Sequence, residues 1–339
     1  MRPSLDTPTT ESARTVAPAP AIERSGSALL PSAILTFALI ALAIGVRARI
    51  ISPGALARLP RREVSIHPAH IWFGAGLGTV FFAAVVAALA QLLVGQPIPP
   101  GEAAGAGGAG GAAGTRGGDA THLQALVLPS IISYAATILA CLAFARLVLA
   151  RGGGLRGLTG PPADAARWPW LVLFPRGASA ADTARAVLAG GAWFAAIMPI
   201  VLTVAMLAAW THERFVGTPP DALAHESLKL MIEHRASAWT WGFIFGAVMG
   251  APIVEEHVYR CFLQSGVIRA GLSPALSIVI VSVVFALTHV NAAPVHALAP
   301  LFVLSLGMGL AYERTGRLLV PVTMHALFNA ANVAMAFVV

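Results

Sequence analysis

Long runs of apolar residues that carry no charge recur along this chain, and they limit what it can fold into. About 20 consecutive apolar residues in a helix cross the hydrocarbon core of a bilayer. Only 11% of the residues are charged, whereas an ordinary soluble domain carries about 25%. Eight apolar runs can be read from the sequence: residues 28–46, 71–94, 124–150, 186–210, 237–254, 273–289, 296–312 and 318–339. The pattern predicts a polytopic membrane protein with about eight spans.

The spans are expected to be helices. The apolar runs are continuous, whereas the strands of a membrane barrel alternate between apolar and polar residues. A helix also satisfies the hydrogen bonds of its own backbone in lipid. The predicted fold class is therefore all-α, a bundle of transmembrane helices.

The formal net charge of +7 does not indicate nucleic-acid binding, because the arginines lie mainly in short connectors between the apolar runs. Arginine-rich connectors are typical of the cytoplasmic side of a membrane. They alternate with arginine-poor connectors, which places both termini outside. Lys229 is the only lysine beside abundant Ala, Arg, Gly and Pro, a bias that resembles a GC-rich bacterial genome. The expected location is a bacterial inner membrane, with the chain passing through it several times.

The chain divides into three predicted parts. Residues 1–27 are polar and rich in Pro, Ser and Thr, and we expect a disordered N-terminal tail. Residues 28–185 would form N-terminal transmembrane helices. Within them, residues 101–118 predict a flexible loop, because glycine costs about 1 kcal/mol relative to alanine at a helical position. Residues 186–339 would form the domain that carries the chemistry. Ionisable side chains at membrane depth cost about 2.5–3.5 kcal/mol and usually mark function, and they gather between residues 255 and 329.

Two adjacent carboxylates open this polar region. Glu256 and Arg260 are four residues apart, so they share a helical face and are expected to form a structural ion pair. Glu255 lies about 100° further round the helix. It is therefore free to point toward a reacting group.

Histidines follow on two later apolar runs. His289 ends the run 273–289, and His325 and Asn329 share a face of the last run, because they are four residues apart. Each of them alone is better explained by a hydrogen bond to a neighbouring helix. A carboxylate, two imidazoles and a carboxamide on three helices together suit a hydrolase, which activates a water and stabilises an oxyanion.

In these motifs the chain resembles the CPBP family of intramembrane proteases, which includes CAAX prenyl endopeptidases and bacteriocin-processing or bacteriocin-immunity proteins. The family pattern Glu-Glu-x-x-x-Arg matches Glu255, Glu256 and Arg260. Phe-x-x-x-His matches Phe285 and His289, and His-x-x-x-Asn matches His325 and Asn329. The resemblance covers residues 186–339.

The resemblance implies an endopeptidase whose catalytic residues are Glu255, Glu256, His289, His325 and Asn329. Glu255 and His289 would activate the water, His325 and Asn329 would stabilise the oxyanion, and Glu256 with Arg260 would hold the helix in register. A zinc-dependent form is an alternative, because Glu255, His289 and His325 would leave an open position on the metal. The expected partners are the lipid bilayer and a peptide or membrane-protein substrate.

Two other classes of function stay open at this stage. One is a non-catalytic immunity or scaffold protein of the same fold, and the other is a transporter or proton relay, which also places Glu and His in the membrane. No inverted repeat supports a transporter. His257, directly after the acidic pair, is expected to be a spectator or a pH-sensitive neighbour.

Overall fold

In a computed structural model of the chain, the described residues are 29–48, 50, 69–94, 115–149, 178–220, 226–290 and 292–338. Over this part of the chain the secondary structure is entirely helical, which confirms the predicted all-α fold class. The helices are α1 (Leu29–Arg47), α3 (Ala69–Val94), α4 (Thr115–Leu149), α5 (Ala180–Val216), α6 (Glu226–Glu233), α7 (Ala238–Phe245), η4 (Gly246–Gly250), α8 (Ala251–Glu256), η5 (His257–Gln264), α9 (Ser265–Arg269), α10 (Pro274–Thr288), α11 (Val295–Thr315) and α12 (Leu319–Ala336).

Each of the eight predicted apolar runs coincides with a helix or a helical segment. Four described helices are long and apolar enough to cross a membrane: α3, α5, α11 and α12. Three shorter apolar stretches, in α1, α4 and α10, fall below that length. The remaining run, 237–254, is part of a continuous helix from α7 to α9 in which the wide turns η4 and η5 are π-helical.

Two boundaries differ from the prediction. Helix α4 begins at Thr115, inside the stretch predicted as a flexible loop. Glycines are tolerated there because extending an existing helix costs less than nucleating one. Helix α5 extends beyond the predicted run at both ends, and Ser179 and Asp182 form a capping box at its start. The predicted tail 1–27 and residues 101–114 lie outside the described residues.

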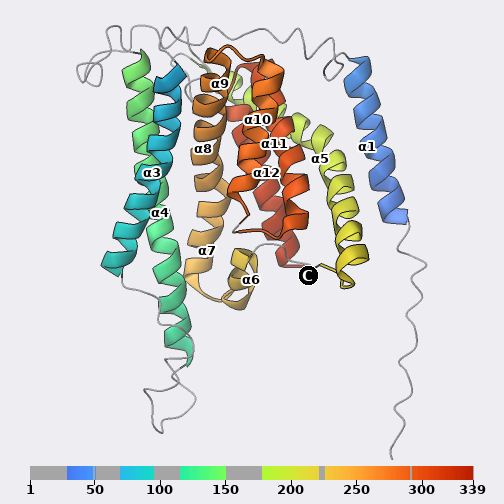
Figure 1. Ribbon diagram of the computed structural model, residues 1–339. Coiled ribbons are helices and arrows are strands. Elements are labelled where there is room, and N and C mark those ends of the chain that lie inside the picture. The colour runs from blue at the N-terminus through green and yellow to red at the C-terminus, as the bar shows by residue number, and fades with distance from the viewer. Residues whose placement is uncertain are drawn as a thin grey trace, which may run out of the picture.

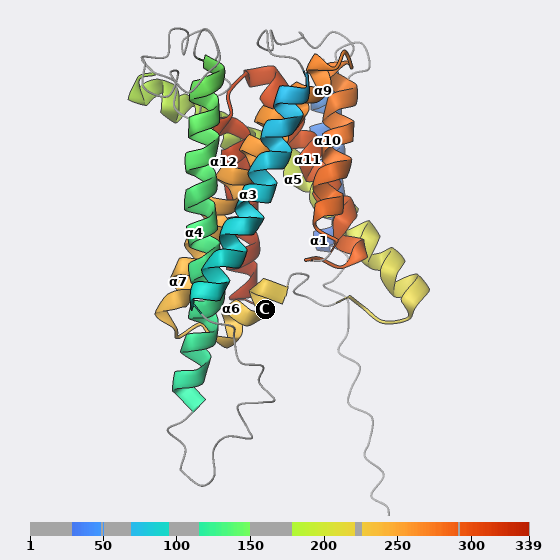
Figure 2. The ribbon, with the colours of Figure 1, turned by 60° about the vertical axis from the view of Figure 1, so that its left-hand side comes forward.

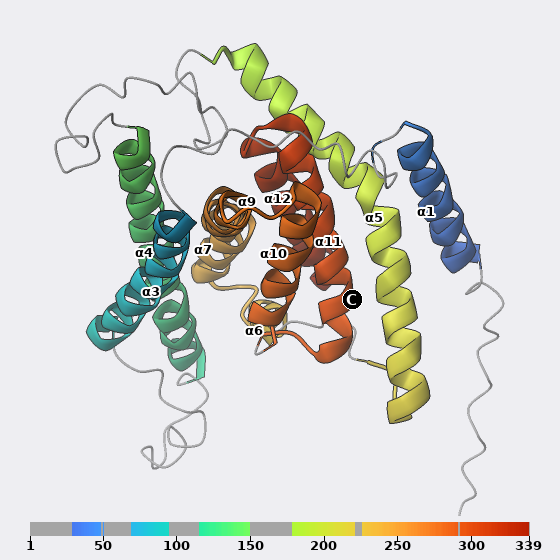
Figure 3. The same ribbon diagram turned by 45° about the horizontal axis from the view of Figure 1, so that its top comes forward.

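The helices run up and down beside one another (Figure 1). Helices α3 and α4 pack together on one side of the molecule, where Figure 2 shows them crossing, and α1 packs against α5 on the other side (Figure 1). The continuous helix α7–α9 lies between these groups. Its first half contacts α4 and α12, and its second half contacts α3, α10 and α11, as the end-on view shows (Figure 3). This helix carries Glu255 and Glu256 near its middle.

Arginines join helix ends at one end of the bundle. Arg314 Nη2 donates to the Ile50 carbonyl at 2.9 Å, and Arg317 Nη1 donates to the Asp182 carbonyl at 3.0 Å. The end of α1, the start of α5 and the connection between α11 and α12 therefore meet there (Figure 1). The opposite end holds α6, which the sequence did not predict and whose Met231 is buried against Val333 and Ala336 of α12.

The core lies where α5, η5, α10, α11 and α12 converge. Phe285, Leu304, Met308 and Met324 are fully buried in one cluster there. Helix α5 approaches α12 closely at Gly190, where an added Cβ would lie 2.6 Å from Thr323 Cβ and 2.9 Å from the Val320 carbonyl oxygen. Small residues allow this kind of close approach between membrane helices.

We expect Gly190→Ala to destabilise the protein by about 1–3 kcal/mol, because the new methyl group overpacks against backbone that cannot move aside. Thermal unfolding in detergent measures the effect. Gly191→Ala is the matched control, since an added Cβ there meets nothing within 4 Å. It should be neutral or stabilising, because alanine favours a helix over glycine by about 1 kcal/mol. Equal stability of the two variants would contradict the tight packing of α5 on α12.

Candidate active site

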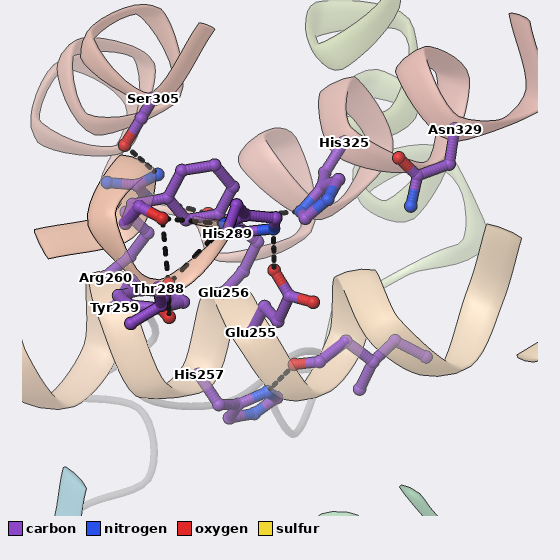
Figure 4. A network of polar contacts seen from close by, with 12 residues as sticks. Glu255, Glu256, His257, Tyr259, Arg260, Thr288, His289, Ser305, His325 and Asn329 are labelled. Atoms are coloured by element: carbon purple, nitrogen blue, oxygen red, sulfur yellow. Dashed lines mark hydrogen bonds and ion pairs between the residues drawn. The ribbon is translucent and has the colours of Figure 1, made fainter. Parts of the chain in front are cut away.

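The two glutamates occupy the last turn of α8, between the π-helical segments η4 and η5. Pro252 in the first turn of α8 has no N–H to donate to the preceding turn. Wide turns of this kind occur often at functional sites, where they redirect side chains. Because adjacent residues of a helix point about 100° apart, Glu255 and Glu256 face different partners, as the sequence predicted (Figure 4).

Glu256 is the centre of a buried network, in which Arg260 Nη1 is left without a hydrogen-bond partner among the described residues. Arg260 Nε donates to Glu256 Oε2 at 2.8 Å, and both side chains are fully buried. His325 Nδ1 lies 3.0 Å from Glu256 Oε1. Arg260 Nη2 donates to Ser305 Oγ on α11 at 2.9 Å. The predicted contact between Glu256 and Arg260 is therefore present, and it is extended by bonds to two further helices.

Glu255 and His289 face each other without a direct hydrogen bond. Glu255 Oε2 and His289 Nε2 are 4.0 Å apart, and the two side chains are 28% and 22% exposed. Glu255 Oε2 makes no hydrogen bond to any described residue. Glu255 Oε2 itself is buried, and 4.0 Å is a separation that one water could bridge once the two side chains part to admit it, as general-base activation requires.

The end of α10 orients the imidazole of His289. The backbone N–H of His289 bonds to the Ala286 and Leu287 carbonyls, so the Phe285 carbonyl is left for side chains. His289 Nδ1 lies 2.7 Å from that oxygen, and Thr288 Oγ1 donates to it at 2.8 Å. Because a carbonyl only accepts, Nδ1 carries the hydrogen. In the neutral ring Nε2 is then an acceptor that faces Glu255.

The Phe285 ring packs in the middle of the polar groups. It is fully buried, and its centroid is 4.7 Å from that of His289 and 5.8 Å from that of His325. Arg260 Cζ lies 5.7 Å above the ring, within the range of a cation–π contact. Phe285 thus separates Glu255 and His289 from the buried ion pair of Glu256 and Arg260, and it shields that ion pair from water.

Asn329 follows His325 by one turn of α12, as predicted. Its Nδ2 donates to the Ala247 carbonyl in η4 at 2.7 Å. An amide carries two N–H groups, so one remains for a ligand. The contact also ties α12 to the wide turn that precedes the glutamates.

His257 points away from the site, toward the other side of its helix (Figure 4). Its Nδ1 bonds to the Ile253 carbonyl at 2.7 Å, and the side chain is buried. This local contact favours the spectator of the two expected roles.

Several polar residues of this region were not predicted as part of the site. Tyr259 and Thr288 share a hydrogen bond, and Gln264 Nε2 donates to Glu313 Oε1 at 2.6 Å. The sequence spacing could have indicated some of them. Glu256, Arg260 and Gln264 lie four residues apart and so share a helical face, and the same holds for Ser305, Gly309 and Glu313. Hydrogen bonds join the two rows where η5 packs against α11.

The alternative metal ligands do not form a group of ligands in this structure. Among the described residues, no three His, Cys, Asp or Glu side chains are arranged to hold a metal ion. His325 turns Nδ1 to Glu256, which removes that nitrogen as a ligand. The zinc form stays an untested prediction.

One family comparison bears on this arrangement. Residues 237–331 match the model of the Rce1-like family, type II CAAX prenyl endopeptidases. This segment is similar to that family. The match contains every predicted site residue and confirms the resemblance, over a shorter range than residues 186–339. No curated protein and no solved structure matches the chain.

The match with the Rce1-like family covers only part of the bundle. It begins just before α7 and ends within α12, so α3, α4 and α5 lie outside it. These helices nevertheless pack against the segment, α4 against α7 to α8 and α5 against α11 and α12. The apolar helices indicate a membrane protein, and over residues 237–331 the chain is similar to a family of proteases.

Proposed function

We propose that the chain is an intramembrane endopeptidase of the CAAX-protease type, which hydrolyses a peptide bond with a water activated by Glu255 and His289. The proposal is carried by the contrast between two neighbouring pairs. Glu255 and His289 face each other at 4.0 Å without a hydrogen bond, directly beside the buried ion pair of Glu256 and Arg260. One carboxylate of two neighbours is left without a hydrogen bond and is partly exposed. A general base needs a carboxylate that is free to take a proton, and a structural ion pair needs one that is fully bonded; the two glutamates differ in this way.

The first step is the attack of water on the scissile carbonyl. The water lies between Glu255 Oε2 and His289 Nε2, and one of these groups takes its proton while the oxygen forms the bond to the carbonyl carbon. The carbonyl double bond opens and its electron pair moves to the oxygen. Holding the water between two fixed acceptors removes the entropy cost of bringing it to the substrate.

The oxyanion that forms would be stabilised by His325 and Asn329. Because His325 Nδ1 faces a carboxylate, a protonated His325 donates its Nε2–H to the substrate, and Asn329 supplies its remaining N–H. Glu256, Arg260 and protonated His325 together carry one net positive charge, which complements the oxyanion. The intermediate then collapses, the C–N bond breaks, and the leaving amine takes the proton held by Glu255 or His289.

The substrate class follows from the location of the site on membrane helices. We propose a peptide or a segment of a membrane protein as substrate, and the inner membrane of a bacterium as the location. The bilayer delivers such a substrate to the depth at which Glu255 and His289 lie.

The test compares membranes of cells that express the wild-type chain or His289→Gln, whose amide cannot take a proton from the water. Mass spectrometry of peptide termini should reveal new C-termini that appear only with the wild type. A peptide that spans such a terminus should then be cleaved by the purified wild-type protein in liposomes, and at least about 10²-fold more slowly by the variant. Equal sets of termini would reject the protease and leave the non-catalytic immunity or scaffold protein. Proton flux through the liposomes without cleavage would instead support the relay.

A further inference from the structure

Two neighbouring residue pairs connect the helix of the glutamates to the end of α10. Glu255 faces His289 at 4.0 Å, and Tyr259, four residues further along the same helix, bonds through its hydroxyl to Thr288 Oγ1 at 2.7 Å. Thr288 and His289 are adjacent in the chain. A closed contact therefore lies directly beside an open one, on the same two helices (Figure 4).

The direction of the hydrogen bonds follows from the hydrogens available. The single hydroxyl hydrogen of Thr288 goes to the Phe285 carbonyl at 2.8 Å. Tyr259 must therefore donate its own hydrogen to Thr288 Oγ1. The same Phe285 carbonyl accepts from His289 Nδ1 at 2.7 Å. A continuous set of hydrogen bonds thus leads from Tyr259 to the imidazole.

The Tyr259 side of this contact is rigid. Only 8% of Tyr259 is exposed, and its ring meets the fully buried Phe285 ring edge to face, with the centroids 5.1 Å apart. Such aromatic pairs have a preferred geometry, so the position of the phenol oxygen is well defined. The end of α10 is held to this oxygen.

Glu255 and His289 need such a constraint to stay apart. A carboxylate and an imidazole left free at 4.0 Å would close to a direct charge-assisted hydrogen bond of about 2.7–2.9 Å. That closure would expel the water and place a hydrogen on His289 Nε2. Neither group could then act as the base.

We propose that Tyr259 and Thr288 are positioning residues of the hydrolytic site. Their hydroxyl pair holds the end of α10 at a distance that prevents a direct hydrogen bond between Glu255 and His289, and it keeps His289 Nε2 unprotonated toward Glu255. The inference rests on the proposed function for its effect on cleavage. Its effect on His289 is independent of that function.

The test uses Tyr259→Phe and Thr288→Val, which remove one hydroxyl each and keep the shape of the side chain. Thr288→Ser restores the hydroxyl. Thr137→Val is the control for loss of a threonine hydroxyl, because the Thr137 hydroxyl also bonds to a carbonyl of its own helix, that of Ser133 on α4, and contacts neither Tyr259 nor His289. If Tyr259→Phe does not fold, Thr288→Val carries the same test.

The first readout needs no substrate. Solid-state NMR of ¹⁵N-histidine-labelled protein in liposomes reports which ring nitrogen carries hydrogen, and the His289 signals are those absent from His289→Gln. We expect hydrogen on Nδ1 alone in the wild type, Thr288→Ser and Thr137→Val. A new Nε2–H signal should appear in Tyr259→Phe and Thr288→Val. An unchanged His289 spectrum in both variants would overturn the proposal.

The second readout is cleavage of the reporter peptide. We expect kcat to fall about 10- to 100-fold in each variant with KM unchanged, because the geometry of the reacting groups is lost and not the binding of substrate. The double variant should lose no more than either single one, since both remove the same contact. A purely structural pair would instead lower thermal stability and leave kcat of the folded protein unchanged. Absence of cleavage by the wild type would reject the proposed function alone, because the NMR readout still decides the inference.

Discussion

Glu255→Gln should abolish cleavage and leave the fold intact. The amide keeps the size of the carboxylate but cannot take a proton from water, so the rate should fall by about 10²-fold or more. Stability should be preserved, because Glu255 Oε2 makes no hydrogen bond among the described residues and its side chain is 28% exposed. Cleavage of the reporter peptide and thermal unfolding of the same purified samples measure the two effects.

Glu213→Gln is the control for this experiment. It makes the same chemical change at an exposed position on α5, away from the site, and should alter neither quantity. Full cleavage by Glu255→Gln would refute the role of Glu255 as a base. If Glu256→Gln then lost cleavage at unchanged stability, the roles of the two glutamates would be reversed.

Glu256→Gln should have the largest effect on stability. It leaves the fully buried Arg260 guanidinium without its carboxylate, and loss of one partner of a buried ion pair costs about 3–5 kcal/mol. Arg260→Met should cost a similar amount for the converse reason. Denaturation of the detergent-solubilised variants, followed through tryptophan fluorescence, measures both.

Two comparisons make this prediction specific. The double variant Glu256→Gln with Arg260→Met should be more stable than the sum of the single losses predicts, because no charge is left unpaired. Arg185→Met removes an arginine from an exposed ion pair with Asp182 and should have little effect on stability, because solvent screens the pair. Equal losses for Arg185→Met and Arg260→Met would show that burial of the pair has no energetic consequence.

Helices and spacings are the features of this protein that can be predicted from local sequence. A run of apolar residues must satisfy its backbone in lipid, so its length and position predict a helix, and each predicted run coincides with one. The pair of Glu256 and Arg260 follows from the helical repeat, because residues four apart share a face wherever the helix lies. The different environment of Glu255 follows from the same geometry. The resemblance to the family predicts that the three segments with these motifs come together in the fold.

Helix ends are less predictable, and the case of α4 shows why. Glycine disfavours a helix in isolation, yet α4 includes Gly117 and Gly118. The balance depends on the helix already formed by the apolar run that follows, which a local reading of residues 101–118 does not include.

The contacts between helices depend on the tertiary structure alone. His325 bonds to Glu256 across 69 residues of chain, Tyr259 meets Thr288, and Asn329 donates to the Ala247 carbonyl. Each contact depends on the crossing angle and the relative depth of two helices, which are set by packing such as the close approach of α5 to α12 at Gly190. The sequence alone therefore predicts the helices, the ion pair and the residue types of the site. The 4.0 Å gap between Glu255 and His289, and the hydroxyl pair beside it, arise only when η5, α10 and α12 pack together.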